Sequence, residues 1–193
     1  MRAFLLGLAG ILATGPREVS CDPAGSVGWP ARCHCGSPAP TVEQARDQAD
    51  HVVVGRVVRR EFVSGILDDS IPSHGPRRWT AEMITVAVEQ GWWGLRADTL
   101  RLLYQSSCDA ELMTHDGSLG QRFLIYAVRG GPIAGAHLRR VRPPLGTDTA
   151  WTEFGPEIPL ERLARASYCG RTRPLADAGS DLRALGRPRW WGR

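Results

Sequence analysis

The chain has 193 residues and a formal net charge of +4, and it contains neither lysine nor asparagine, so all 24 basic side chains are arginines. Lysine Schiff-base catalysis, a phosphate-loop lysine and N-linked glycosylation are therefore excluded. The 22 glycines and 14 prolines favour a loop-rich domain built from strands over a helical bundle.

The N-terminus predicts export. Arg2 precedes an apolar run over residues 4–13, too short to span a bilayer as a helix but long enough for the core of a secretory signal. We expect a signal peptide over residues 1–26, ending between residues 20 and 26, and no transmembrane span. Cleavage after Ser26 would remove Cys21; alternatively, Cys21 begins the mature chain and carries a lipid anchor. Either way the protein is expected to be secreted, periplasmic or extracellular.

The cysteines predict disulfides, because export places them in an oxidising compartment. Cys33 and Cys35 are one residue apart, so a relaxed disulfide between them is not possible and each needs a distant partner. Cys108 and Cys169 are the two downstream cysteines. Two connectivities stay open, namely Cys33 with Cys108 and Cys35 with Cys169, or the reverse. Cys21, if it is retained unmodified, is an odd thiol.

The ordered domain is expected to start after a flexible lead-in over residues 27–32. Thr41 and Gln44 form a capping-box pattern, which predicts a short helix that ends at about residue 49. Residues 51–63 are rich in valine and predict a long strand with both faces partly buried. Gly55 lies inside this strand and predicts a bulge where the strand serves two sheets.

Alternating apolar and polar residues predict further strands, and residues rich in glycine and proline predict the connections between them. The expected strands are residues 79–90, 99–105, 120–128 and 133–141, with the last two paired as a hairpin. The expected connections are a loop over residues 64–76, a turn over residues 91–94, and an irregular segment over residues 143–164 with a helical turn near Leu160. Leu175, Leu182 and Leu185 recur at helical spacing before a helix stop at Gly186.

About five strands with a helix before them and another after them predict a mainly β fold, a small closed or partly open barrel. Several motifs together resemble the netrin-like module, which is shared with the N-terminal domain of the tissue inhibitors of metalloproteinases. The motifs, spread over residues 33–186, are Cys33-His34-Cys35, the strand around Gly55, the Trp93-Gly94 turn, Cys108, the strand in residues 120–127, and the closing segment 169–172.

This resemblance implies a five-stranded OB-type barrel in which disulfides join Cys33 to Cys108 and Cys35 to Cys169. It also implies a non-catalytic binding module whose partner is a protein or a cell-envelope component. In the inhibitors of this group, the amine and carbonyl of an N-terminal half-cystine chelate the zinc of the protease. Here a second cleavage after Arg32 would be needed to expose Cys33, and His34 would then face the substrate pocket of the zinc metalloprotease. Metalloprotease inhibition is therefore the alternative function.

Residues 187–193 form a basic aromatic tail with Arg187, Arg189, Trp190 and Trp191. We expect a solvated or loosely packed terminus, and the alternative is a surface that binds an anionic lipid or a glycan. OB-type barrels also bind glycans or nucleic acids, but export disfavours nucleic acid as the partner.

The sequence predicts no enzyme. Cys108, His115 and Asp116 resemble a nucleophile, base and orienting acid, but they fall within one loop, whereas a triad is defined by geometry. Nucleophile-elbow, zinc-protease and phosphate-loop motifs are all missing from the sequence. We expect no catalytic residues, no metal site and no cofactor.

Overall fold

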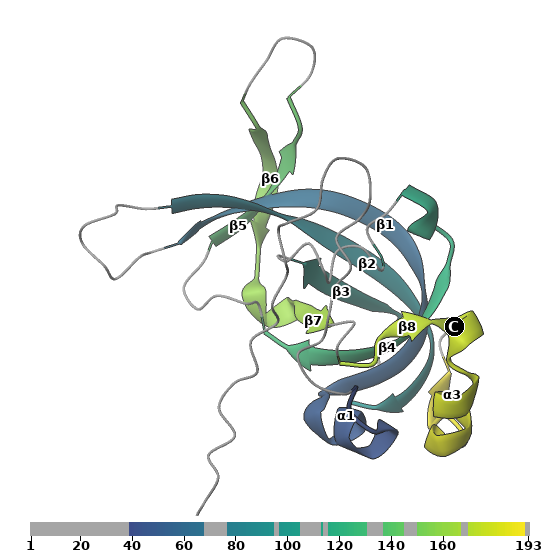
Figure 1. Cartoon of the computed structure of the whole chain (residues 1–193). Coiled ribbons are helices and arrows are strands. Elements are labelled where there is room, and N and C mark those ends of the chain that lie inside the picture. Colours follow the sequence, from purple (N-terminus) through teal and green to yellow (C-terminus); the bar gives the residue numbers. More distant parts are fainter. Residues whose placement is uncertain are drawn as a thin grey trace, which may run out of the picture. The chain divides into compact units, whose positions relative to one another are not determined.

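The described part of the chain is mainly β, with nine strands in one sheet and two α-helices (Figure 1). The computed structural model describes residues 39–67, 77–94, 97–104, 113, 116–130, 137–144, 150–166 and 170–191, all within the unit formed by residues 39–193. The predicted signal peptide, the lead-in and all five cysteines lie outside these residues.

The strands are β1 (His51–Leu67), β2 (Arg77–Trp93), β3 (Thr99–Tyr104), β4 (Arg122–Arg129), β5 (His137–Arg142), β6 (Thr152–Ile158), β7 (Ala164–Ala166), β8 (Arg173–Pro174) and β9 (Trp190–Trp191). The α-helices are α1 (Val42–Gln48) and α3 (Gly179–Leu185). Three short 3-10 helices cover Asp116–Ser118, Leu160–Arg162 and Leu175–Asp177.

Helix α1 begins where the capping box predicts it. The backbone N–H of Gln44 donates to Oγ1 of Thr41 at 3.2 Å, and the backbone N–H of Thr41 donates to Oε1 of Gln44 at 3.0 Å. The two bonds satisfy backbone donors that the first helical turn leaves free. Ala45 then packs on Val52 and Val54 of β1, which anchors the helix to the sheet.

Strand β1 pairs irregularly at Gly55, where a bulge was predicted, but it belongs to one sheet and not to the two that were expected. The pairing between β1 and β2 shifts its register between Val54 and Gly55, and a Cβ atom at Gly55 would overlap the Val86 side chain and come within 2.7 Å of the Ala87 carbonyl oxygen. On its other edge β1 pairs with β4 over residues 51–56 and with β5 over residues 62–66. β1 therefore pairs with two different strands along the same edge.

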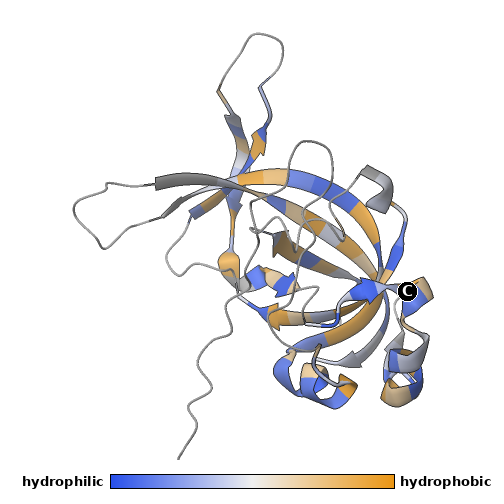
Figure 2. Cartoon of the chain, viewed as in Figure 1, coloured by the Kyte–Doolittle hydropathy of each residue, from blue (hydrophilic) through white to orange (hydrophobic). Residues whose placement is uncertain are grey.

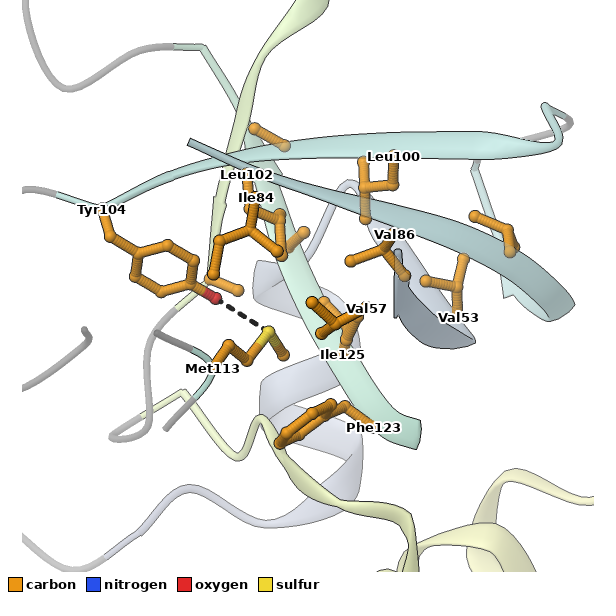
Figure 3. Close-up of a cluster of buried hydrophobic side chains, with 14 residues drawn as sticks. Val53, Val57, Ile84, Val86, Leu100, Leu102, Tyr104, Met113, Phe123 and Ile125 are labelled. Carbon is orange, nitrogen blue, oxygen red and sulfur yellow. Dashed lines mark hydrogen bonds between the residues drawn. The ribbon is translucent and has the colours of Figure 1, made fainter. Parts of the chain in front are cut away.

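The strand pairings close into a ring that runs β1–β2–β3–β7–β4 and back to β1. All of these pairs are antiparallel except β3–β7, in which Leu102 lies opposite Ala164 in a parallel pair. Apolar side chains fill the ring, and the Tyr104 hydroxyl points at the Met113 sulfur at 3.2 Å (Figure 3). In Figure 2 the strands of the ring, most plainly β4, carry long hydrophobic stretches.

Strands β5 and β6 form a wing beyond this ring, at the end of β1 remote from α1 (Figure 1). The predicted hairpin between residues 120–128 and 133–141 was wrong, because β5 pairs with β1 and β6 instead. The helical turn near Leu160 is confirmed, but the surrounding segment is not irregular, since it contains β6 and β7. β6 was not predicted because it contains Gly155 and Pro156, which are rare in strands. Both residues are tolerated here because β6 lies at the edge of the sheet.

The two long strands run further than predicted. β1 continues to Leu67, into the predicted loop over residues 64–76, and β2 includes Gly91, Trp92 and Trp93, which were predicted to turn. Each extension has partners: residues 64–66 pair with both β2 and β5, while Gln90 and Gly91 pair with β9. Hydrogen bonding to neighbouring strands therefore overrides a local composition typical of turns.

Helix α3 ends at Gly186, as predicted, with φ at 70° in the left-handed region that glycine adopts readily. Residues 187–191 were expected to be solvated or loosely packed, but Trp190 and Trp191 form β9 against β2, and Trp190 packs against the interior of the ring. A large apolar ring gains free energy from this burial, which favours docking over solvation. No helix in the described ranges is long and apolar enough to cross a bilayer.

Candidate binding groove

A groove of about 390 Å³ lies where the ends of α1, β2 and α3 meet. Its lining consists of Arg46, Asp47, Trp92, Trp93, Leu185, Arg187 and Arg189. We call it the Arg–Trp groove. Its volume is within the range of sites that hold small molecules.

Trp92 forms the fixed base of the groove. It is 7% exposed and packs with Ala49, which follows α1, while Leu185 of α3 packs against the same cluster. Its indole Nε1–H donates to the carbonyl oxygen of Gly186 at 2.8 Å. That bond satisfies the polar atom of a buried indole and ties the end of α3 to the end of β2.

Trp93, the next residue of β2, lines the same groove but is far more exposed than Trp92. It is 49% exposed, and the Arg189 guanidinium lies over its ring, 5.5 Å from the centroid. This distance is within the range of a cation–π contact. Arg189 is held at the same place by its backbone N–H, which donates to the carbonyl oxygen of Gly91 at 2.8 Å.

The charge of the groove is positive and incompletely neutralised. Arg46 pairs with its neighbour Asp47 at 3.0 Å. Arg187 and Arg189, in contrast, have no carboxylate partner among the described residues. Several arginines on the strands are paired, as Arg60 is with Glu82 at 2.5 Å. The groove therefore presents two guanidinium groups that are available to an anion.

A buried ion pair positions the helix that carries one wall of the groove. Asp181 of α3 is fully buried and accepts from Arg171, whose Nη1–H also donates to the Pro40 carbonyl oxygen at 2.6 Å. Burial raises the pKa of Asp181, but the Arg171 hydrogen bonds and the Arg173 charge outweigh it, and the net direction is down. Burial, and then the charge of Asp181, raise the pKa of Tyr126, whose hydroxyl lies 3.4 Å from that carboxylate.

The sequence identified two of the seven residues that line this groove. Arg187 and Arg189 line it, whereas Trp190 contributes to the interior and Trp191 pairs with Gln90. Arg46 was missed, because its place on the polar face of α1 carries no signal until the packing of α1 against β2 is known. The other proposed site residues, Cys21, Cys33, His34, Cys35, Cys108 and Cys169, lie outside the described residues.

His51 is a buried histidine at one end of the ring. It is 3% exposed at the start of β1, and its Nε2 accepts from Nε–H of Arg129 at 3.3 Å. Burial and the Arg129 charge lower the pKa of His51, and Asp50 acts in the opposite direction. Within the described ranges there is no group of three or more histidine, cysteine or acidic residues that could hold a metal ion.

No protein-family model, curated protein or solved structure matches this chain. The netrin-like resemblance therefore rests on the residues of this chain alone.

Proposed function

We propose that this chain is a secreted, disulfide-stapled and non-catalytic binding module of the netrin-like type, whose partner is a protein or a cell-envelope component. Binding takes place in the Arg–Trp groove. The closed ring of strand pairings, with β3 and β7 as its parallel pair, supports an OB-type barrel as the scaffold.

The observation that carries the proposal is the pair Arg187 and Arg189 beside the half-exposed Trp93. Exposed arginine and tryptophan side chains are the residues that dominate the energetics of binding surfaces. The two arginines have no acidic partner among the described residues, so a ligand anion can bind them without first displacing a carboxylate.

Co-sedimentation of the oxidised full chain with the cell-envelope fraction of the source organism tests this proposal. Wild type is expected to sediment with the envelope, and the double variant R187E/R189E is expected to stay in solution. The matched control is R139E/R165E, which reverses the same number of exposed charges on β5 and β7. Equal sedimentation of all three proteins would contradict the proposal.

Point substitutions are needed because deletion of the tail would remove structure as well as the two arginines. Removal of residues after Gly186 would also remove β9 and the contact of Trp190 with the interior. Loss of binding by such a truncated chain could then result from loss of structure. Arg187 and Arg189 are exposed, so their replacement leaves the packing of the ring unchanged.

A further inference from the structure

We infer that the ligand of the Arg–Trp groove is an acidic saccharide, whose carboxylate or sulfate groups bind Arg187 and Arg189 while a sugar ring packs on Trp93. This inference rests on the proposed function, since it names the class of ligand for the same groove. It follows from three properties of the groove: two arginines without a carboxylate partner among the described residues, an exposed indole, and a volume larger than a simple anion requires.

The charge selects an anion with oxygen acceptors. A guanidinium group presents a planar fork of N–H donors that matches the two oxygens of a carboxylate or of a sulfate. Arg189 lies over the Trp93 ring, and the contact leaves N–H groups at the rim of the guanidinium plane free to donate sideways. Arg187 and Arg189 are separated by one residue and line the same groove, so two neighbouring acidic groups can be bound at once.

The exposed indole selects a ligand with an apolar face. Trp93 is 49% exposed, and Leu185 adds an aliphatic surface to the lining. The ring hydrogens of a pyranose carry small positive charges, so one face of a sugar packs favourably on the negative face of an indole. Inorganic phosphate or sulfate alone would leave this surface, and most of the volume of about 390 Å³, unused.

Two other anionic ligands fit the groove less well. Single-stranded nucleic acids bind along a basic track on which successive bases stack on several aromatic side chains. Trp93 is the one tryptophan of this lining that is substantially exposed, because Trp92 is buried. A bilayer surface is bound by apolar side chains that insert from a protruding surface. Here Trp93 and the arginines line a concave groove.

Calorimetric titration of the oxidised full chain at about 0.15 M salt tests the inference. The acidic probes are a heparin-derived hexasaccharide, which carries carboxylates and sulfates, and an oligogalacturonate, which carries carboxylates alone. The comparison probes are maltohexaose as a neutral sugar, single-stranded oligothymidylate, and vesicles of phosphatidylglycerol with phosphatidylcholine. The acidic oligosaccharides are expected to bind, with maltohexaose at least about tenfold weaker.

Single variants locate the binding. R187Q and R189Q are each expected to weaken the affinity for the acidic oligosaccharide about tenfold, as for the loss of one charged hydrogen bond. W93A should weaken the same affinity about fivefold through loss of the stacking surface. The control R139Q removes one exposed arginine from β5 and is expected to change the affinity less than about twofold.

The outcomes separate this inference from the proposed function. Maltohexaose that binds as tightly as the acidic probes would overturn the inference, as would tighter binding of oligothymidylate or of anionic vesicles through the same arginines. Arginine-dependent co-sedimentation that the acidic oligosaccharides fail to compete away would also overturn it, and the groove would still be the binding site. Equal co-sedimentation of wild type and R187E/R189E would refute the proposed function.

Discussion

Arg171 and Asp181 form a bidentate ion pair in which Nη2 lies 2.6 Å from Oδ1 and Nε lies 2.9 Å from Oδ2. The pair joins the segment before β8 to helix α3. Through the bond from Arg171 to the Pro40 carbonyl oxygen, it also reaches the residues just before α1. Both helices contribute residues to the Arg–Trp groove. The ion pair therefore fixes the position of α1 relative to α3, and with it two walls of the groove.

Replacement of Asp181 by asparagine is therefore expected to destabilise the fold and to weaken groove binding together. The variant leaves a largely buried guanidinium without its counter-charge, which costs about 3 kcal/mol. Urea unfolding measures this loss. The control D177N changes an exposed acid of the neighbouring 3-10 helix and should stay within about 0.5 kcal/mol of wild type. Equal stabilities of D181N and D177N would refute the positioning role of the pair.

Gly94 is expected to be far less tolerant of alanine than Gly120. Both glycines have positive φ, at 77° and 81°, so alanine is strained to a similar extent at each. A Cβ atom at Gly94 would overlap the carbonyl oxygen of Asp50, whereas Gly120 has no atom within 4 Å of that position. We expect G120A to cost about 1 kcal/mol and G94A at least about 3 kcal/mol in urea unfolding. A difference close to zero would show that the two backbones are not packed as described.

His51 is expected to make folding stability decline as the pH falls below about 6.5. Burial and the Arg129 charge hold the pKa of the folded-state imidazole below its ordinary value, so the unfolded chain binds more protons in this window. Stability then rises with pH by at most about 1.4 kcal/mol per unit between the folded and unfolded pKa values. Urea midpoints between pH 5 and 7 should depend on pH less steeply in H51Q than in wild type. Identical pH profiles would exclude His51 as the source.

The disulfide pattern and the mature N-terminus are testable on one unreduced sample. Peptide mapping is expected to recover Cys33 linked to Cys108 and Cys35 linked to Cys169. Intact mass is expected to place the first residue near Cys21 or Val27, which leaves no free amine on Cys33. A mature chain that begins at Cys33 would instead favour the metalloprotease inhibitor, and free thiols at all four positions would contradict the stapled module.

Features with a local cause could be predicted from the sequence. Thr41 and Gln44 start α1 through bonds within one helical turn, and Gly186 ends α3 through its own backbone freedom. Pairing between distant strands could not be predicted in this way. Whether β5 joins β4 or β1 depends on which edge is free, and β4 already pairs with β1, β7 and β8.

The same distinction applies to the groove. Arg187 and Arg189 were identified because they stand in a basic aromatic stretch. The stretch was nevertheless expected to be solvated or loosely packed, since the local composition does not show that Trp190 and Trp191 pair with the edge of β2. Arg46 joins them only through the packing of α1, a contact between segments about 140 residues apart.

The most direct test of the Arg–Trp groove is a titration of the isotopically labelled full chain with solubilised envelope polysaccharide, followed by NMR. The indole N–H signal of Trp93 and the Nε–H signal of Arg189 are expected to shift. The indole signal of Trp151 is expected to stay in place, because Trp151 packs against Phe62 near the β5–β6 wing, at the other end of β1. Shifts at Trp151 with Trp93 unchanged would contradict binding in the groove.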